Sequence, residues 1–257
     1  MKRIVLSTLL SVAAATTIQA KTGLDIEIGV GVWAPEFSGN ISYGSTHKEN
    51  IGLNELGLDD KKFSDSSYIY ADFSHFVPIV PNLRIENTKY SVNGSSTINR
   101  YWNDIQINAT ANTKLDLTKT DFIAYWNLPF LDTLTNDTLD ISYGIAIEQA
   151  KGEMSINNDK KSFDEYIPMA YLGAIIEIPT TDITLEARLK TIKYDGATMQ
   201  DIEYKFSYEL PGFIPAVDIN LDFGYKTQSI EIPSSLVDKL DVNFDAKGYF
   251  FGINAQF

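Results

Sequence analysis

The chain has 257 residues, 34 of them acidic and 21 basic, with a net charge of −13 and no cysteine. So negative a charge argues against a nucleic-acid partner, because binding phosphates requires a basic face. The missing cysteines exclude thiolate metal sites, disulfides, cysteine nucleophiles and a lipid anchor carried on cysteine. The length allows one large domain or two small ones.

Residues 1–20 predict a secretory signal peptide. Lys2 and Arg3 precede a short apolar run that closes on Ile18-Gln19-Ala20. A positive start, an apolar middle and a small final residue form the cleavable pattern, and the run is too short to span a membrane. We expect cleavage after Ala20, which leaves residues 21–257 as a single domain. The alternative is a buried N-terminal helix.

A period of two dominates the rest of the chain. In residues 24–32 every even position is aliphatic, and every odd position is acidic or glycine. This alternation gives a β-strand one apolar face and one polar face. It recurs over residues 139–148, 183–190, 201–209 and 217–226 and at the C-terminus. Many of these stretches exceed the ~5–6 residues of soluble strands and suit the ~9–11 residues of a membrane-spanning strand.

Ten strands are predicted, and prolines mark their ends because proline cannot donate to a sheet ladder. In chain order they cover residues 23–37, 68–77, 83–93, 114–126, 138–149, 165–178, 183–194, 197–210, 217–228 and 243–257. The connections at one end are predicted to be short. Those at the other end are mostly longer, covering about 38–67, 93–113, 149–163, 194–197 and 228–242. An even strand count brings both chain ends to one side, as in outer-membrane barrels.

The weakest predictions concern the second to fourth strands. In residues 114–126 the apolar positions change phase, from Leu115 and Leu117 to Phe122, Ala124 and Trp126. We interpret the change as a β-bulge or as a wrong pairing. If residues 83–93 and 114–126 do not form a hairpin in the wall, the barrel has eight strands.

The two strand faces together predict a transmembrane antiparallel β-barrel. A soluble barrel with these faces turned the usual way would bury about a dozen charges, at several kcal/mol each. Turned outward, the apolar face contacts lipid, and the charges line the lumen. The rival interpretation is a soluble periplasmic sandwich with one solvated face, which strand length and the C-terminus both disfavour.

The last strand carries the most specific signal. Its apolar face consists of Tyr249, Phe251, Ile253, Ala255 and the terminal Phe257. This pattern resembles the C-terminal strand of bacterial outer-membrane barrels. The resemblance implies recognition by the outer-membrane assembly machinery, a location in the outer membrane, and contact with its lipid and lipopolysaccharide. The oligomeric state is open.

A narrower resemblance concerns both ends of the predicted barrel. The first strand reads Gly29-Val30-Gly31-Val32-Trp33, and the last contains Gly248-Tyr249-Phe250-Phe251-Gly252. The chain thus resembles a family of small, largely uncharacterised bacterial outer-membrane proteins with a glycine-rich first strand and a C-terminal phenylalanine. That family implies a location and a fold, and no chemistry.

The predicted lumen face carries thirteen charged residues. These are Asp25, Glu27, Asp140, Glu148, Glu186, Arg188, Lys190, Asp201, Glu203, Lys205, Asp218, Asp222 and Lys226. One interpretation is an ion-pair network that fills a narrow barrel. The other is a narrow conduit that weakly favours cations. Glycines on the same face would widen the lumen or relieve crowding.

We expect no catalytic, cofactor or metal site, and therefore no enzyme. The two histidines, His47 and His75, lie in different predicted segments, and no nucleophile-elbow, phosphate-loop or HExxH pattern is present. Some ten-stranded outer-membrane barrels are proteases that use Asp and His at the outer mouth. Neither histidine here lies in a pattern that resembles theirs.

The first long connection carries Ile51, Leu53, Leu56 and Leu58, which a short helix would turn to one side. They pack on the barrel rim or form a partial plug of the mouth. Two functions remain open for the whole chain. The first is a narrow passive channel or small-solute-binding barrel. The second is a structural or surface-interaction barrel with a closed lumen, whose loops contact lipopolysaccharide or other cells.

Overall fold

The computed structural model describes residues 24–58, 66–136, 138–157, 159–214, 217–235 and 238–257. The predicted signal peptide and its cleavage after Ala20 lie outside these residues. Ten long strands dominate, together with the two-residue β2 (Ile51–Gly52) and the short helix α3 (Leu131–Thr135). The long strands are β1 (Leu24–Tyr43), β3 (Ser66–His75), β4 (Asn82–Trp102), β5 (Ile105–Asn127), β6 (Leu139–Ile156), β7 (Asp159–Glu177), β8 (Ile183–Tyr194), β9 (Ala197–Ile214), β10 (Val217–Ile232) and β11 (Leu240–Gln256).

The strands form one closed antiparallel sheet. Each long strand pairs with the next in the chain, and β11 pairs with both β10 and β1, for example at Gly31 and Gly252. Closure satisfies the backbone groups of both edges. The predicted ten-stranded barrel is confirmed, and the eight-stranded alternative and the two-sheet sandwich are wrong. No helix in the described ranges is long and apolar enough to cross a membrane.

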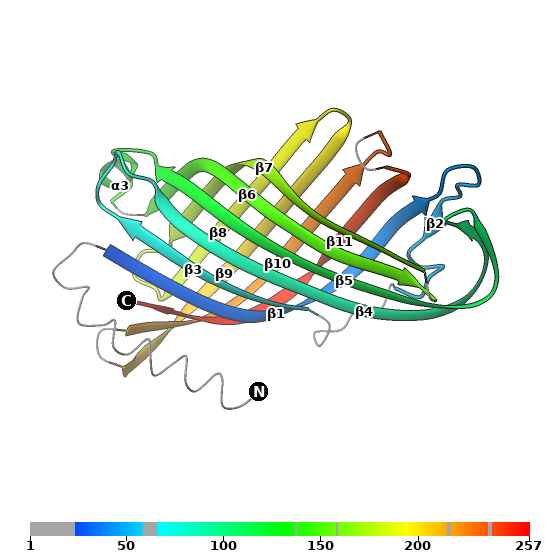
Figure 1. Cartoon of the computed structure of the whole chain (residues 1–257). Coiled ribbons are helices and arrows are strands. Elements are labelled where there is room, and N and C mark those ends of the chain that lie inside the picture. Colours follow the sequence, from blue (N-terminus) through cyan, green and yellow to red (C-terminus); the bar gives the residue numbers. More distant parts are fainter. Residues whose placement is uncertain (1–23, 59–65, 137, 158, 215–216, 236–237) are drawn as a thin grey trace.

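The two ends of the barrel differ (Figure 1). At one end, called here the terminal end, β1 begins and β11 ends, beside α3. The opposite far end carries residues 44–58, called here the first loop, which include β2, and the tips of the other hairpins. The first loop is long, whereas β4–β5, β6–β7 and β8–β9 are joined by only two residues each.

The predicted long connections over 93–113 and 149–163 are therefore wrong, because most of those residues extend the strands. At two tips the chain turns through residues with positive φ, Asn103 and Asp104 in one and Asp195 and Gly196 in the other. Two such residues in succession make the tight turn that matches the twist of a hairpin. The two ends of the barrel therefore differ mainly in how far the strands project, and less in the length of the loops that join them.

Neither a β-bulge nor a wrong pairing causes the change of apolar phase in β5. β5 pairs with β4 and with β6 in a single unbroken register, so the hairpin is part of the wall and carries no bulge. Leu115 and Leu117 instead face the lumen, in line with Lys119 and Asp121. The inner face of the strand changes from charged to apolar along its length.

The same reversal occurs on neighbouring strands. On β6 the outward residues are apolar from Leu139 to Ile147 and polar from Gln149 to Ser155, while the inward ones change from Glu148 to Met154 and Ile156. The apolar outer stretch is nine residues long, close to the ~9–11 of a spanning strand. On β11, Tyr249, Phe251 and Ile253 are exposed in the equivalent belt. Beyond this belt the barrel has a polar outside and an apolar inside.

The first loop fills a gap in the far half of the wall. β3 is short, and its pairing ends with Ser66 opposite Tyr90 of β4 and with Ser67 opposite Val32 of β1. Above that level β2 pairs with β1, and the backbone of Leu56 lies so close to Gly94 of β4 that a Cβ there would not fit. All four apolar residues of the predicted cluster, Ile51, Leu53, Leu56 and Leu58, are buried in the barrel core. They form a two-residue strand and turns, and the expected helix is not found there.

Candidate functional site: a lumen in two halves

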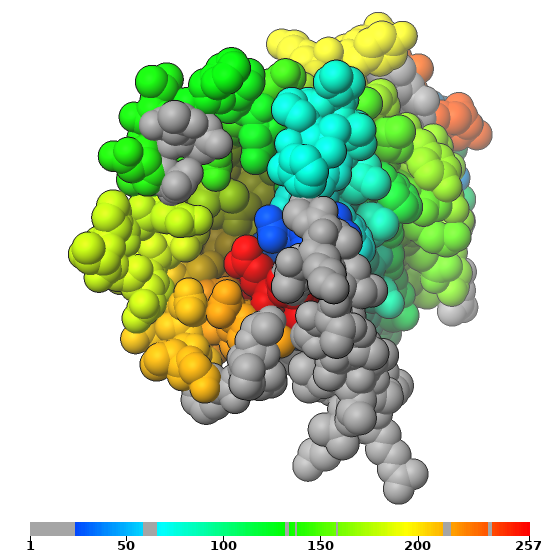
Figure 2. Space-filling model, turned by 90° about the vertical axis from the view of Figure 1, so that its left-hand side faces the viewer, coloured from blue at the N-terminus to red at the C-terminus, as the bar shows by residue number. Residues whose placement is uncertain are grey.

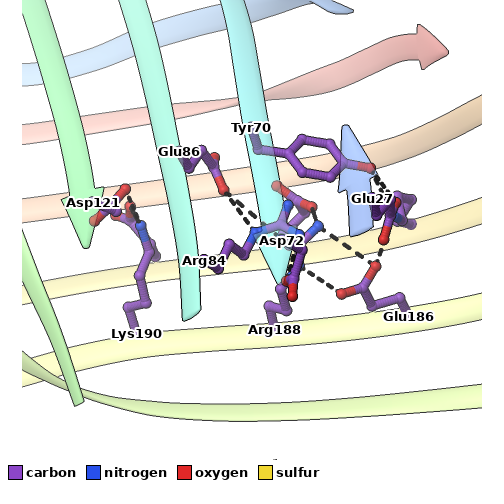
Figure 3. Close-up of polar contacts among 12 residues, drawn as sticks. Glu27, Tyr70, Asp72, Arg84, Glu86, Asp121, Glu186, Arg188 and Lys190 are labelled. Carbon is purple, nitrogen blue, oxygen red and sulfur yellow. Dashed lines mark hydrogen bonds and ion pairs between the residues drawn. The ribbon is translucent and has the colours of Figure 1, made fainter. Parts of the chain in front are cut away.

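The lumen near the terminal end, called here the charged half, is filled by two ion-pair clusters (Figure 3). The larger cluster joins Arg84, Arg188, Lys205 and Lys226 to Glu27, Asp72, Glu86, Glu186 and Glu203. The smaller joins Lys119 and Lys190 to Asp121, Glu148 and Asp201. Each cluster contains one more carboxylate than it has cations.

Several of these contacts join strands that are not neighbours in the sheet. Glu86 of β4 lies 2.6 Å from Lys226 of β10 and 3.8 Å from Arg188 of β8. Lys119 of β5 contacts Asp201 of β9 at 2.9 Å. Because these pairs reach across the barrel, they occupy the lumen itself. The Lys119 side chain is fully buried, as is that of Glu148.

Burial makes these pairs interdependent. A charge taken out of water costs several kcal/mol unless a partner and further hydrogen bonds offset that cost. Tyr70 supplies such support, because its hydroxyl donates to Glu27 at 2.5 Å and the Arg84 guanidinium lies 3.8 Å from its ring centroid. Gln228 donates to Asp201 at 3.0 Å. The result is a packed polar layer across the barrel.

The thirteen residues expected in the lumen fall into two groups. Nine of them belong to the two clusters: Glu27, Glu148, Glu186, Arg188, Lys190, Asp201, Glu203, Lys205 and Lys226. Asp222 is also buried and accepts hydrogen bonds from Ser207 at 2.7 Å and Asn254 at 2.9 Å. The other three lie toward the terminal end, where Asp25 and Asp218 are exposed and Asp140 is half-buried.

Five charged residues of the clusters were missing from the sequence prediction: Asp72, Arg84, Glu86, Lys119 and Asp121. They lie on β3, β4 and β5, where the alternation is weakest. A usable signal exists, because Arg84 and Glu86 alternate with Leu83 and Ile85. The same holds for Asp121 beside Phe122.

Inner glycines make room for aromatic rings and do not open the lumen. A Cβ at Gly29 would collide with the ring of Tyr70, and one at Gly31 with that of Tyr68. Of the two roles considered for these glycines, the packing matches the relief of crowding. The mouth of the barrel at the terminal end is hollowed, as Figure 2 shows. There a polar cavity of about 390 Å³ is lined by residues such as Glu177, Asp182 and Glu209.

The lumen near the far end, called here the apolar half, has the opposite character. Its inward residues include Trp33, Phe37, Val92, Leu115, Leu117, Met154, Phe163, Met199, Ile230 and Phe244. Aromatic rings pack closely at one side, with Phe37 5.5 Å from Phe244 and Trp33 5.4 Å from Tyr90 between centroids. A cavity of about 100 Å³ remains among these side chains.

The β4–β5 hairpin tip holds the first loop over this half. Arg100 pairs with Glu55 at 3.1 Å, Glu49 accepts from the Tyr101 backbone N–H at 3.1 Å, and His47 stacks on Tyr101 at 4.8 Å. The Asp104 carboxylate accepts from the backbone N–H groups of residues 45–47, two of them at 2.7 Å. Those bonds, the one from His47 first, lower the pKa of Asp104.

The second histidine lies far from the first loop. His75 ends β3 at the terminal end, where its Nδ1 accepts from the backbone N–H of Val77 at 3.2 Å. Within the described part of the chain, no group of three or more histidine, aspartate and glutamate side chains is arranged to hold a metal ion.

Solved structures with a similar fold include bacterial outer-membrane β-barrels. No protein-family model matches the chain, and no curated protein sequence matches it. Among solved structures it is similar to the attachment invasion locus protein Ail of Yersinia pestis, with a TM-score of 0.38 and 6% identity over 92% of this chain and 100% of that one. Neisserial surface protein A gives a TM-score of 0.33 and 11% identity, covering 92% of this chain and 98% of that one. A FadL homologue of Pseudomonas aeruginosa gives 0.30 and 9%, covering 91% and 90%.

Proposed function

We propose that this chain is an integral outer-membrane β-barrel that is closed to ion flow and holds a small solute in the apolar half of its lumen. The observation that carries the proposal is the pairing of two features in one lumen. Ion pairs cross the barrel between non-neighbouring strands, and a cavity lies directly beyond them. A barrel blocked at one level and hollow at the next favours binding over conduction.

The membrane location is supported by the outer face. The exposed apolar belt on β6 covers nine residues, and charged side chains are on the inside at that level. Lipid is the solvent that suits such a belt. The predicted signal peptide, cleaved after Ala20, would deliver the chain to the periplasm. The terminal end then faces the periplasm, and the far end faces outward.

Contact with the envelope follows from the same placement. The belt would contact outer-membrane lipid, and the polar outer face beyond it would contact lipopolysaccharide. We retain Tyr249, Phe251, Ile253, Ala255 and Phe257 as the proposed signal for the assembly machinery, and the narrower family resemblance as a proposal. No catalytic role is proposed.

A second function is favoured by one further observation. The β4–β5 hairpin extends from the belt residue Ile85 to Trp102, with a polar outer face along Lys89, Asn93 and Asn99. Such a projection suits contact with other surfaces. Shortening the hairpin by equal numbers of residues on both strands would test this role in a cell-adhesion assay.

Conductance in planar bilayers tests the main proposal. We expect folded protein, identified by its heat-dependent shift in gel mobility, to give no discrete current steps in 1 M KCl. Regular steps with a reproducible size would overturn the closed lumen. Fractionation of cells that express the full chain tests the location, because the protein must be recovered with the outer membrane.

A further inference from the structure

We infer that the cavity in the apolar half binds a small, uncharged, apolar molecule of about the size of benzene. This inference rests on the proposed function, since it names the class of solute that the lumen holds. Fifteen of the twenty residues that line the cavity are apolar, and they come from strands on all sides of the barrel and from the first loop. A ligand with charged or hydrogen-bonding groups would find few partners in such walls.

Lys119 lies at the base of the cavity, called here its floor, and its positive charge is already paired with carboxylates. Lys119 lines the cavity, but its ammonium group already contacts Glu148 and Asp201, at 2.8 and 2.9 Å. Drawing it toward an anionic ligand would leave two buried carboxylates without it. Anionic solutes are therefore disfavoured at this level, and the floor separates an apolar chamber from the polar layer beneath it.

The roof is made by the first loop and the neighbouring hairpin. Leu53 of the first loop and Trp102 at the end of β4 both line the cavity and are 3% and 1% exposed. Tyr43 packs against Trp102 with ring centroids 5.4 Å apart. An apolar solute bound there would be shielded from water, which is the main source of affinity for such a ligand.

The size of the cavity limits the ligand. An apolar cavity of about 150 Å³ inside a protein stays dry and binds benzene or xenon. The cavity of about 100 Å³ found here is somewhat smaller. It admits a single small ring or a short branched alkane, and a bicyclic ring would need a wall residue to be reduced. Met154 is such a residue, buried and lining the cavity.

Quenching of tryptophan fluorescence by bromobenzene tests the site, because the bromine quenches only at short range. The protein in lipid nanodiscs keeps Trp102 as its one tryptophan, with Trp33→Phe and Trp126→Phe. A matched protein keeps only Trp126, on the outward face of β5, and reports bromobenzene dissolved in the lipid. We expect saturable quenching of Trp102 and linear quenching of Trp126. Equal linear quenching of both overturns the inference.

Two variants place the ligand in the cavity. Ala150→Phe fills the space at the base of the cavity, opposite Lys119, and is expected to weaken the saturable phase at least about tenfold, whereas Ala170→Phe on the exposed face of β7 leaves it unchanged. Met154→Ala is expected to create saturable quenching by 1-bromonaphthalene. An unchanged curve in folded Ala150→Phe overturns the site. If that variant does not fold, the absence of the size change in Met154→Ala overturns it.

The outcome is separable from that of the proposed function. A barrel that is electrically silent but shows no saturable quenching retains the closed lumen and loses the apolar ligand. Current steps overturn the proposed function whatever the quenching.

Discussion

The two halves of this barrel share a continuous alternation along their strands, yet the polarity of the inner and outer faces is reversed between them. In the charged half the outside is apolar, and Lys119 lies inside with Glu148 and Asp201. In the apolar half the outside is polar, and Leu117 lies inside on the same strand, two residues away. The difference teaches that one fold can suit two solvents, and in the proposed membrane location lipid surrounds one half and water the other.

The largest expected effect comes from removing a cation from the charged half. Lys119→Met leaves Glu148 and Asp201 without their shared partner, so we expect a loss of about 3–5 kcal/mol in the free energy of unfolding. The control is Lys151→Met, because Lys151 also pairs with a carboxylate, Asp164 at 3.0 Å, but its side chain is 67% exposed. Its loss should stay below about 1 kcal/mol. Urea unfolding in lipid vesicles measures the free energy of unfolding of both variants. Equal losses would mean that the ion pairs of Lys119 are not buried.

A lysine placed on the outer face tests where the reversal falls. Leu172→Lys lies in the apolar belt of β7 and should cost about 2–4 kcal/mol. Ser162→Lys lies on the same face of the same strand, ten residues toward the far end, and should cost less than about 0.5 kcal/mol. The same unfolding assay compares them. A similarly high cost at both positions would mean that lipid surrounds both halves, and a similarly low cost would mean that it surrounds neither.

The smallest expected effect concerns the first loop and pH. The folded-state pKa of Asp104 lies below its usual 3.8, so its bonds to residues 45–47 favour the docked loop above that value. They are lost as the pH falls through the lower folded value. Hydrogen exchange of the Thr46 and His47 amides should show protection at pH 5 that declines in strong acid. Asp104→Asn should reduce this protection and remove its dependence on pH. An unchanged pH profile of exchange would mean that the Asp104 carboxylate does not hold the first loop.

The barrel itself was predictable because alternation is a local signal. The alternation predicts the ten strands to within several residues at most boundaries near the terminal end, since the apolar outer belt repeats along the barrel. The differences lie at the far end, where the sequence predicts a loop over 93–113 and the structure has two strands. Residues such as Asn93, Ser95 and Asn99 suit a loop by composition, and only pairing with β5 makes them a strand.

The apolar half could not be predicted by a rule that assigns one polarity to each face. Leu115 and Leu117 break the outward apolar pattern and suggest a bulge or a wrong pairing, although they mark the level at which the polarity of both faces reverses. The contacts across the lumen were also out of reach. Nothing local to Glu86 indicates Lys226, 140 residues later, because closure of the whole barrel brings them together.

A double-mutant cycle on Glu86 and Lys226 tests the central claim most directly. These residues belong to β4 and β10, and their contact at 2.6 Å exists only if ion pairs cross the lumen. Glu86→Gln, Lys226→Met and the double variant are compared by urea unfolding in vesicles. The closed lumen predicts a coupling free energy of about 1–3 kcal/mol. A coupling free energy within about 0.3 kcal/mol of zero would mean that no ion pair joins β4 to β10 across the lumen.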